Sequence, residues 1–286
     1  MRKRDRLVVV SALLMALSLP ASGWDFAVDL AKSGEYPQAA LEFRRLAMDY
    51  EGAEECGAFS WLAGYSYWKS GRYWQAERML NLTEEAAPAL ETEIYLLRAG
   101  NSRSWRRPDE AAFYLESLMD ESRKEPVRRL ATLQLAAVQV EAGKLAEARA
   151  LLDASPFGTD AAAVGAIDVY SRGRDKSLVV GGLLGLVPGL GYAYSGEYAN
   201  ALRSLILNAL CIWGVVEFVD REQWGGVAVV GFAGVTFYSG SIYGGADAAA
   251  RFNRRRLEAC TRAIEKDARF EPDFGALPLL DLKFSF

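Results

Sequence analysis

Hydrophobic residues are concentrated in one part of the chain. The region Ser177–Ala246 is sparse in charge, whereas the sequence before it is densely charged. This region contains two long apolar blocks, Ala199–Val219 and Trp224–Ala246, in which Arg203 and Glu217 are the charged residues. Because a helix of about 20 predominantly apolar residues crosses a bilayer core, each block is predicted to span a membrane.

A shorter apolar block, Ser177–Gly196, precedes these two. It is just long enough to cross but is interrupted by Pro188-Gly189 and by Gly191. Interrupted backbone at membrane depth is tolerated where it is buried in protein or lines a cavity. We therefore expect a re-entrant or interfacial segment, with a full span as the alternative, and a membrane domain over residues 177–253.

The N-terminal segment Met1–Gly23 has the pattern of a signal peptide. A basic start precedes an apolar core from Leu7 to Leu19, and the small residues Ala21 and Gly23 suit cleavage before Trp24. The alternative is an uncleaved anchor. In both cases the following region is expected to be exported.

Between residues 24 and 155 the sequence repeats. Ser33-Gly-Glu-Tyr36 recurs as Ser70-Gly-Arg-Tyr73, and Ala142-Gly-Lys-Leu145 fits the same slot. Small residues also recur, 37, 35 and 37 residues apart, at Ala39, Ala76, Ala111 and Ala148. Such a period is typical of stacked helix pairs. The pattern predicts an all-α fold in which four helix pairs form a solenoid, followed by a small helical membrane hairpin.

The repeated segment resembles the tetratricopeptide repeat. The second copy matches best, at Gly64, Tyr67, Gly71, Tyr73, Ala76, Leu80 and Pro88. The first copy keeps Gly34, Tyr36, Ala39 and Phe43, and the fourth keeps Ala136, Gly143, Ala148 and Leu152. In the third copy Arg106 replaces the turn glycine and Pro108 replaces the aromatic residue, so we expect a longer turn there.

The resemblance also indicates a concave surface formed by the first helix of each pair. Its positions hold Trp61, Tyr65 and Trp68 in the second copy and Arg103 in the third. These residues are the candidate partner-binding site, an aromatic groove for a peptide or strand. The alternative is that the aromatic residues pack against the neighbouring helix, and the sequence leaves both interpretations open.

Residues 156–176 are expected to form a connector with a capping helix over Asp160–Tyr170, because solenoids need capped ends. Residues 254–286 begin as a charged helix extension and end in Leu280–Phe286, which alternates apolar and polar residues as a half-buried strand does. Its terminal Phe resembles the C-terminal signal of outer-membrane barrel proteins, and the tail is a candidate for addition to another protein's sheet. The alternative is a tail folded on its own array. No other segment has a strand pattern.

The membrane region has a second resemblance. Pro188-Gly-Leu-Gly-Tyr-Ala-Tyr-Ser-Gly196 resembles the entry of small bacterial two-span hairpin domains, which implies a membrane location. The pairs Gly240/Gly244 and Ser241/Gly245 allow close helix contact in lipid. The polar candidates at membrane depth are Asn200, Asn208 and Asp247. They either serve a function or form hydrogen bonds between helices.

Composition argues against most other classes of protein. A net charge of −4 gives no signal for nucleic-acid binding. Histidine is absent, which excludes histidine-dependent triads and histidine zinc sites. The cysteines Cys56, Cys211 and Cys260 show no metal-binding spacing, and no phosphate-binding loop follows a strand. We expect no enzymatic activity, no cofactor and no metal.

Together these features predict a membrane-anchored adaptor or assembly factor of a bacterial cell envelope. It would sit in the inner membrane with its array in the periplasm, and would contact a protein partner and membrane lipid. The alternative is an accessory subunit of a channel or transport system, in which the hairpin forms homo-oligomers. Arg251 and Arg254–Arg256 favour a cytoplasmic C-terminus, whereas a re-entrant first block would return it to the periplasm.

Overall fold

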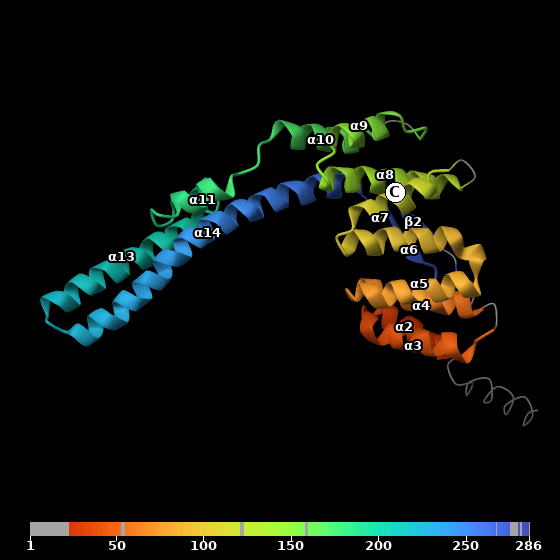
Figure 1. The fold of residues 1–286 in the computed structure, drawn as a ribbon, viewed down its shortest axis with the longest axis horizontal. Coiled ribbons are helices and arrows are strands. Elements are labelled where there is room, and N and C mark those ends of the chain that lie inside the picture. The colour runs from red at the N-terminus through yellow and green to blue at the C-terminus, as the bar shows by residue number, and fades with distance from the viewer. Residues whose placement is uncertain are drawn as a thin grey trace, which may run out of the picture. The chain divides into compact units, whose positions relative to one another are not determined.

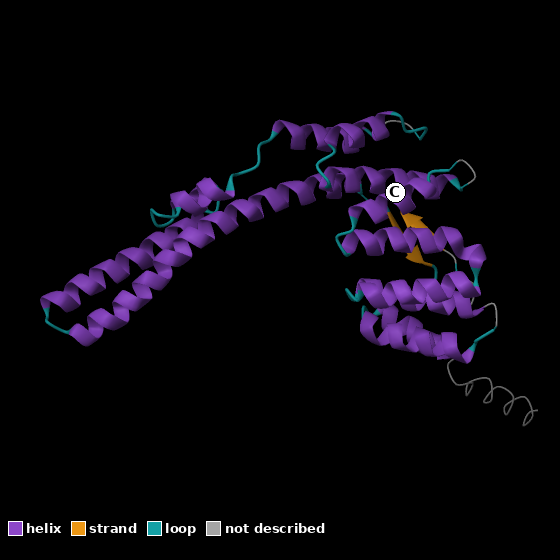
Figure 2. Cartoon of the chain, in the orientation of Figure 1, coloured by secondary structure: helices purple, strands orange, loops and turns teal. Residues whose placement is uncertain are grey.

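The computed structural model describes residues 23–52, 55–120, 123–157, 160–266, 268–274, 280 and 282–285. Helices dominate these residues, and a small two-stranded sheet lies near the C-terminus (Figure 2). The predicted all-α class is thereby confirmed. The chain forms two compact units, residues 1–159 with 265–286, and residues 160–264. Apart from Gly23, the predicted signal segment lies outside the described residues.

The first unit is an array of helix pairs that follow one another along the stack (Figure 1). Its helices are α2 (Gly23–Lys32), α3 (Tyr36–Asp49), α4 (Glu55–Lys69), α5 (Tyr73–Ala86), α6 (Glu91–Ser104), α7 (Pro108–Ser117), α8 (Glu125–Glu141) and α9 (Leu145–Asp153), with a 3-10 turn, η1 (Pro88–Leu90), before α6. The recurring alanines Ala39, Ala76, Ala111 and Ala148 are all fully buried. A methyl side chain at these positions lets the second helix of each pair approach its neighbours closely.

Within each pair, a three-residue turn joins the two helices. In the second pair the turn is Ser70–Arg72, where Gly71 has a φ of 74° and the Arg72 N–H donates to the Tyr67 carbonyl at 2.9 Å. The middle residue must adopt the left-handed conformation that glycine tolerates best. Gly34 and Gly143 do the same in their turns, with φ values of 79° and 78°.

The expectation of a longer third turn is wrong. This turn, Trp105–Arg107, also has three residues, and the Arg107 N–H donates to the Ser102 carbonyl at 2.8 Å. Arg106 occupies the glycine position with a φ of 61°. The packing of the two helices therefore imposes a left-handed conformation on the middle residue of the turn, whatever its side chain. For a residue with a Cβ, this conformation destabilises the fold by roughly 1–2 kcal/mol.

After the second unit the chain returns to the array as a β-hairpin. Strand β1 (Arg269–Pro272) pairs antiparallel with β2 (Leu282–Ser285), so that Phe270 lies opposite Phe284. Strand β2 falls within the alternating tail, of which residues 281 and 286 lie outside the described part. Strand β1 was not expected, because its Arg-Phe-Glu-Pro sequence is too short to show a period.

The second unit consists of helices of very different length. They are α10 (Ala161–Arg172), α11 (Leu178–Leu184), α12 (Leu190–Tyr194), α13 (Tyr198–Asp220) and α14 (Trp224–Ile264). Helix α10 begins at a strong N-cap, because the Asp160 carboxylate accepts from the backbone N–H groups of Ala162 and Ala163. It packs on α14 within the second unit, and its role as a cap of the array stays a prediction. The Arg256 guanidinium holds it there by donating to the Tyr170 carbonyl at 2.7 Å.

The segment before α13 turns back on itself, and its contacts with successive residues of α14 trace its path. Lys176 exchanges two backbone hydrogen bonds with the Asn253 side chain, at 2.7 and 2.9 Å. Further along, the Gly189 N–H donates to the Ser241 hydroxyl, three turns of α14 away. Glu197 then lies beside Arg251, with an ion pair at 2.8 Å. The chain therefore descends along α14 and returns to nearly the same level.

Glycines make this reversal sterically feasible. Gly181 and Gly191 lie against Gly245 so closely that a Cβ on Gly191 would be 2.7 Å from the Gly245 Cα. Gly244 lies against the Tyr192 ring. The expected small-residue pairs on α14 thus receive α11 and α12, whereas a Cβ on Gly240 would meet nothing within 4 Å.

Helices α13 and α14 are long and apolar enough to cross a membrane, with mean hydropathies of 1.7 and 1.4 over their most apolar windows. The core helix of a soluble protein can be as long and as apolar, but it would be mostly buried. Here only 6% of each window is buried. Their exposed side chains include Leu205, Ile212, Trp213, Phe232 and Val235.

Candidate functional site

The aromatic residues of α4 form a stripe along one side of this helix. The rings of Trp61 and Tyr65 stack with centroids 5.6 Å apart, and Trp68 meets Tyr65 edge-on at 5.8 Å. The C-terminal hairpin covers this stripe: the Phe270 ring lies parallel to Trp68 at 6.1 Å and also contacts Trp61 at 6.5 Å. Phe270 is itself buried.

The two tryptophans also join α4 to α6. The Trp61 Nε1 donates to the Glu93 carbonyl at 2.8 Å, and the Trp68 Nε1 donates to the Gly100 carbonyl at 3.1 Å. Trp61 has no exposed surface, whereas Trp68 is partly exposed. The stripe therefore packs against the neighbouring helix and against the tail of its own chain.

The hairpin presents one apolar face to the array. Phe270 and Pro272 are buried, whereas Arg269 and Glu271 between them are exposed. Because directly paired residues of antiparallel strands point to the same face, Leu282 and Phe284 lie on the side of Pro272 and Phe270. The apolar residues that alternate along the tail therefore face the array of the same chain.

Arg103, the fourth candidate, links three parts of the first unit. Its guanidinium forms an ion pair with Glu141 of α8 at 2.7 Å and a second ion pair with Glu265, just after α14. Burial raises the pKa of Glu265, and the Arg103 charge opposes that rise. Arg103 therefore fixes the point at which the chain re-enters the array.

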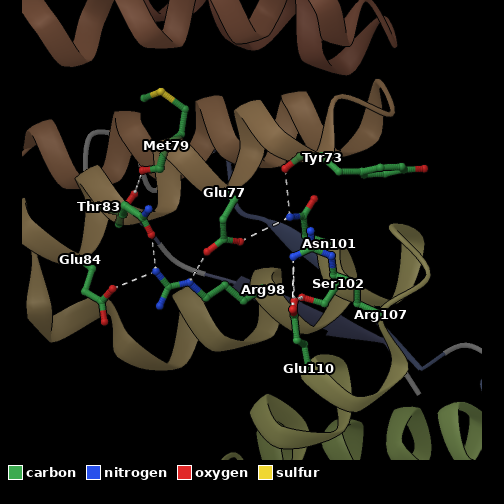
Figure 3. A network of polar contacts seen from close by, with 11 residues as sticks. Tyr73, Glu77, Met79, Thr83, Glu84, Arg98, Asn101, Ser102, Arg107 and Glu110 are labelled. Atoms are coloured by element: carbon green, nitrogen blue, oxygen red, sulfur yellow. Dashed lines mark hydrogen bonds and ion pairs between the residues drawn. The ribbon is translucent and has the colours of Figure 1, made fainter.

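A second polar network joins α5 to α6 (Figure 3). The buried Arg98 lies between Glu77 and Glu84, with N···O distances of 3.0 and 2.9 Å, and donates to the Asn81 side chain at 2.7 Å. Asn101 donates to the Tyr73 carbonyl one turn further along. Sequence reasoning missed this network, because its members lie up to 28 residues apart and gather only when two helix pairs stack.

A groove of about 570 Å³ remains between the first helix pairs and the hairpin. Its lining comprises Ala31, Lys32, Tyr36, Tyr65, Glu271, Pro272, Asp273, Phe274 and Lys283. Burial, together with Tyr36 and Glu271, raises the pKa of Tyr65, so its hydroxyl stays protonated and available as a donor. The groove offers charges of both signs beside aromatic rings, a chemistry suited to a polypeptide.

The polar membrane candidates lie in the second unit. Asn208 is buried and donates to the Ser204 carbonyl of its own helix at 2.8 Å. Asn200 and Asp247 flank a carboxylate that sequence reasoning missed, Glu197. Asn200 donates to Glu197 at 2.8 Å, and Asp247 pairs with Arg251, which also pairs with Glu197.

Glu197 is the centre of this cluster. It accepts from Arg251 at 2.8 and 2.9 Å and from Arg255 at 3.3 Å, and its side chain is 8% exposed. The hydrogen bonds from Arg251, opposed by burial and aided by the one from Asn200, lower the pKa of Glu197 to about 2. The cluster holds the start of α13 against α14.

Neither comparison with protein families nor comparison with curated proteins or solved structures finds a match for this chain. Within the described ranges, no group of three histidine, cysteine, aspartate or glutamate side chains is arranged to hold a metal ion. The function of the protein must therefore be inferred from the geometry of the chain itself.

Proposed function

We propose that this protein is a membrane-anchored adaptor or assembly factor of a bacterial cell envelope, which binds a protein partner through a tetratricopeptide-like array. The observation that carries the proposal is the exposure of α13 and α14. Two adjacent helices with apolar side chains on nearly every face are costly in water, since each large side chain loses roughly 1.5–3 kcal/mol by remaining hydrated. In a bilayer the same surface is solvated by lipid.

The path of the chain also supports a topology. With two crossings, α13 and α14, and a segment 177–196 that turns back, the chain enters and leaves the membrane on one side. The packing of Phe270 on Trp68 supports the same arrangement, because tail and array are in contact. A cleaved or uncleaved signal at the N-terminus would place both in the periplasm.

The arginines after the second span fit this topology once their contacts are considered. Arg251 and Arg255 pair with Glu197, and Arg256 pairs with Asp175. They have structural partners, so their charge is largely compensated and gives little signal for a cytoplasmic location. Arg254 is left as the exposed, unpaired member of the group within the described residues.

The groove beside the hairpin is the surface that we assign to the partner. It is open, it carries Lys32 and Glu271 next to Tyr36 and Tyr65, and Tyr65 is the residue of the aromatic stripe that lines it. A partner segment that reached Trp68 would have to displace Phe270. The tail thereby restricts access to the stripe and favours partners that bind the groove as it stands.

Single cysteines in a cysteine-free background test the topology. Lys283→Cys on the tail and Glu85→Cys on the array should react with a membrane-impermeant thiol reagent once the outer membrane is opened. Gln223→Cys, in the turn between α13 and α14, should react only after the inner membrane is breached. If Gln223→Cys and Lys283→Cys react at the same stage, the two-crossing anchor is wrong.

A photo-reactive amino acid tests the partner surface. Placed at Lys32 in the groove, it should give an adduct with a discrete envelope protein, whereas the same residue at the exposed Glu85 should not. Identical adducts from both positions, or none from Lys32, would contradict the assignment. The mass of the complex in detergent separates an adaptor, which stays a monomer, from a channel accessory that forms a closed ring.

A further inference from the structure

A polar cleft lies in the second unit among α12, α13 and α14. Its volume is about 410 Å³. The lining comprises Tyr192, Asn200, Arg203, Ser204, Leu207, Asn208, Thr236, Phe237, Gly240, Ser241 and Arg251. Polar groups therefore line one side of helices that otherwise present apolar side chains.

The polar side chains deeper in the cleft form only part of the hydrogen bonds that they could form. Asn208 donates through Nδ2 to the Ser204 carbonyl at 2.8 Å, and its Oδ1 accepts from no group among the described residues. Thr236 donates to the Phe232 carbonyl at 3.0 Å. Each side chain satisfies itself on its own helix and keeps further capacity for hydrogen bonds. A polar group without a partner is costly at membrane depth, so a ligand with oxygen and hydroxyl groups would be stabilised there.

The outer end of the cleft carries a cation without a counter-ion. Arg203 is exposed, and its nearest polar contact is the Asn200 Oδ1 at 3.5 Å. No carboxylate lies within ion-pair distance of it in the described chain, whereas the neighbouring Arg251 is paired with both Glu197 and Asp247. An unpaired arginine near the end of a membrane helix extends toward the interface, where anionic lipid headgroups are available to pair with it.

We propose that this cleft binds the headgroup of an anionic phospholipid, with the phosphate on Arg203 and Asn200. The ester oxygens would lie further inward, where the Ser204 hydroxyl and the second N–H of the Asn208 Nδ2 group can donate to them. The stretch of α13 from Arg203 to Asn208 covers roughly 7 Å along the helix axis, close to the depth of one headgroup layer. The inference rests on the membrane placement proposed above.

A second copy of the chain fits the cleft less well. Most homodimers are two-fold symmetric, and a symmetric contact over this cleft would bring Arg203 close to its equivalent in the other copy. Two unpaired guanidinium groups held close together repel each other. A lipid phosphate has the opposite charge and is present at the depth of Arg203.

The experiment uses the full chain in nanodiscs of phosphatidylcholine, with phosphatidylglycerol added as the probe and bound lipid counted by native mass spectrometry. The wild-type chain should prefer phosphatidylglycerol by roughly fivefold, as expected for one basic residue at an anionic headgroup. Arg203→Gln should abolish the preference, whereas Asn208→Leu should reduce the amount of bound lipid of both kinds. Arg254→Gln is the matched control, because it removes an exposed arginine outside the cleft, and it should keep the preference.

Equal loss in the Arg203 and Arg254 variants, or equal binding of both lipids by the wild type, would overturn the lipid site. Glycerol 1-phosphate that displaces the lipid at equal concentration would show a free phosphate ligand and overturn it as well. Lipid-independent dimers in the mass spectrum would assign the cleft to a second copy. A chain that fails to enter nanodiscs at all contradicts the membrane anchor, which distinguishes failure of the proposed function from failure of this site.

Discussion

Phe270 lies parallel to Trp68, with ring planes 4° apart and centroids 6.1 Å apart. The two residues are separated by 202 positions in sequence and by both apolar helices. Aromatic pairs of this kind contribute about 0.5–1.5 kcal/mol beyond the area that they bury. The contact ties the end of the chain to the middle of the array and keeps the hairpin over the aromatic stripe.

Loss of the Phe270 ring should release the hairpin. Phe270→Ala removes a buried aromatic side chain, for which about 3 kcal/mol is the expected loss, so the amides of β1 and β2 should exchange hydrogen far faster while α4 and α6 keep their protection. Phe113→Ala, at an exposed ring of α7, should change stability by less than about 0.5 kcal/mol. Unchanged exchange in the hairpin of the Phe270 variant would show that the stacking does not hold it.

The left-handed turns should respond in opposite directions to two substitutions. Gly71→Val forces a β-branched residue to a φ of 74° and should cost roughly 1–2 kcal/mol or more. Arg106→Gly relieves the same strain in the third pair and should leave stability unchanged or raise it by up to about 1 kcal/mol. Denaturant melts of both variants give the comparison, and a destabilised Arg106→Gly chain would mean that its side-chain contacts outweigh the backbone strain.

The reversal before α13 should tolerate no side chain at Gly191. A Cβ there would collide with the backbone of Gly181 and Gly245, so Gly191→Ala should separate α12 from α14 and lower the melting temperature of the second unit. Gly240→Ala, where the space is open, should be neutral or slightly stabilising in a helix. Equal melting temperatures for the two variants would argue that the loop does not pack on α14.

The Glu197 cluster predicts a dependence on acid. Because the pKa of Glu197 is lowered from 4.5 to about 2, its contribution to stability is complete above about pH 4.5 and is lost as the pH falls toward 2. Glu197→Gln should therefore lower the melting temperature at pH 7, and the difference from the wild type should shrink at pH 3. Glu217→Gln, at an exposed i, i+4 pair with Arg221, should show little effect at either pH. If Glu197→Gln lowers the melting temperature equally at pH 7 and pH 3, Glu197 stabilises the protein through packing and not through its charge.

The sequence by itself determined the features that arise from local patterns. The spacing of Ala39, Ala76, Ala111 and Ala148 predicted helix pairs, because each pair must bury one apolar face against the next. The glycines at 34, 71 and 143 marked turns, because glycine is the residue that most readily adopts a positive φ. The length and composition of α13 and α14 likewise depend on adjacent residues alone.

Only the tertiary structure decided the remaining features, because they depend on residues far apart in the chain. The sequence did not show that Arg106 adopts a positive φ, because the packing of the helix pair around it imposes that conformation. The alternating tail was compatible with a foreign sheet or with the array, and the contact of Phe270 with Trp68 selects the array here. Gly100 lies outside any turn, yet a Cβ on it would be 2.9 Å from the Trp68 ring. Such constraints come from surfaces that exist only after the pairs have stacked, so no local pattern contains them.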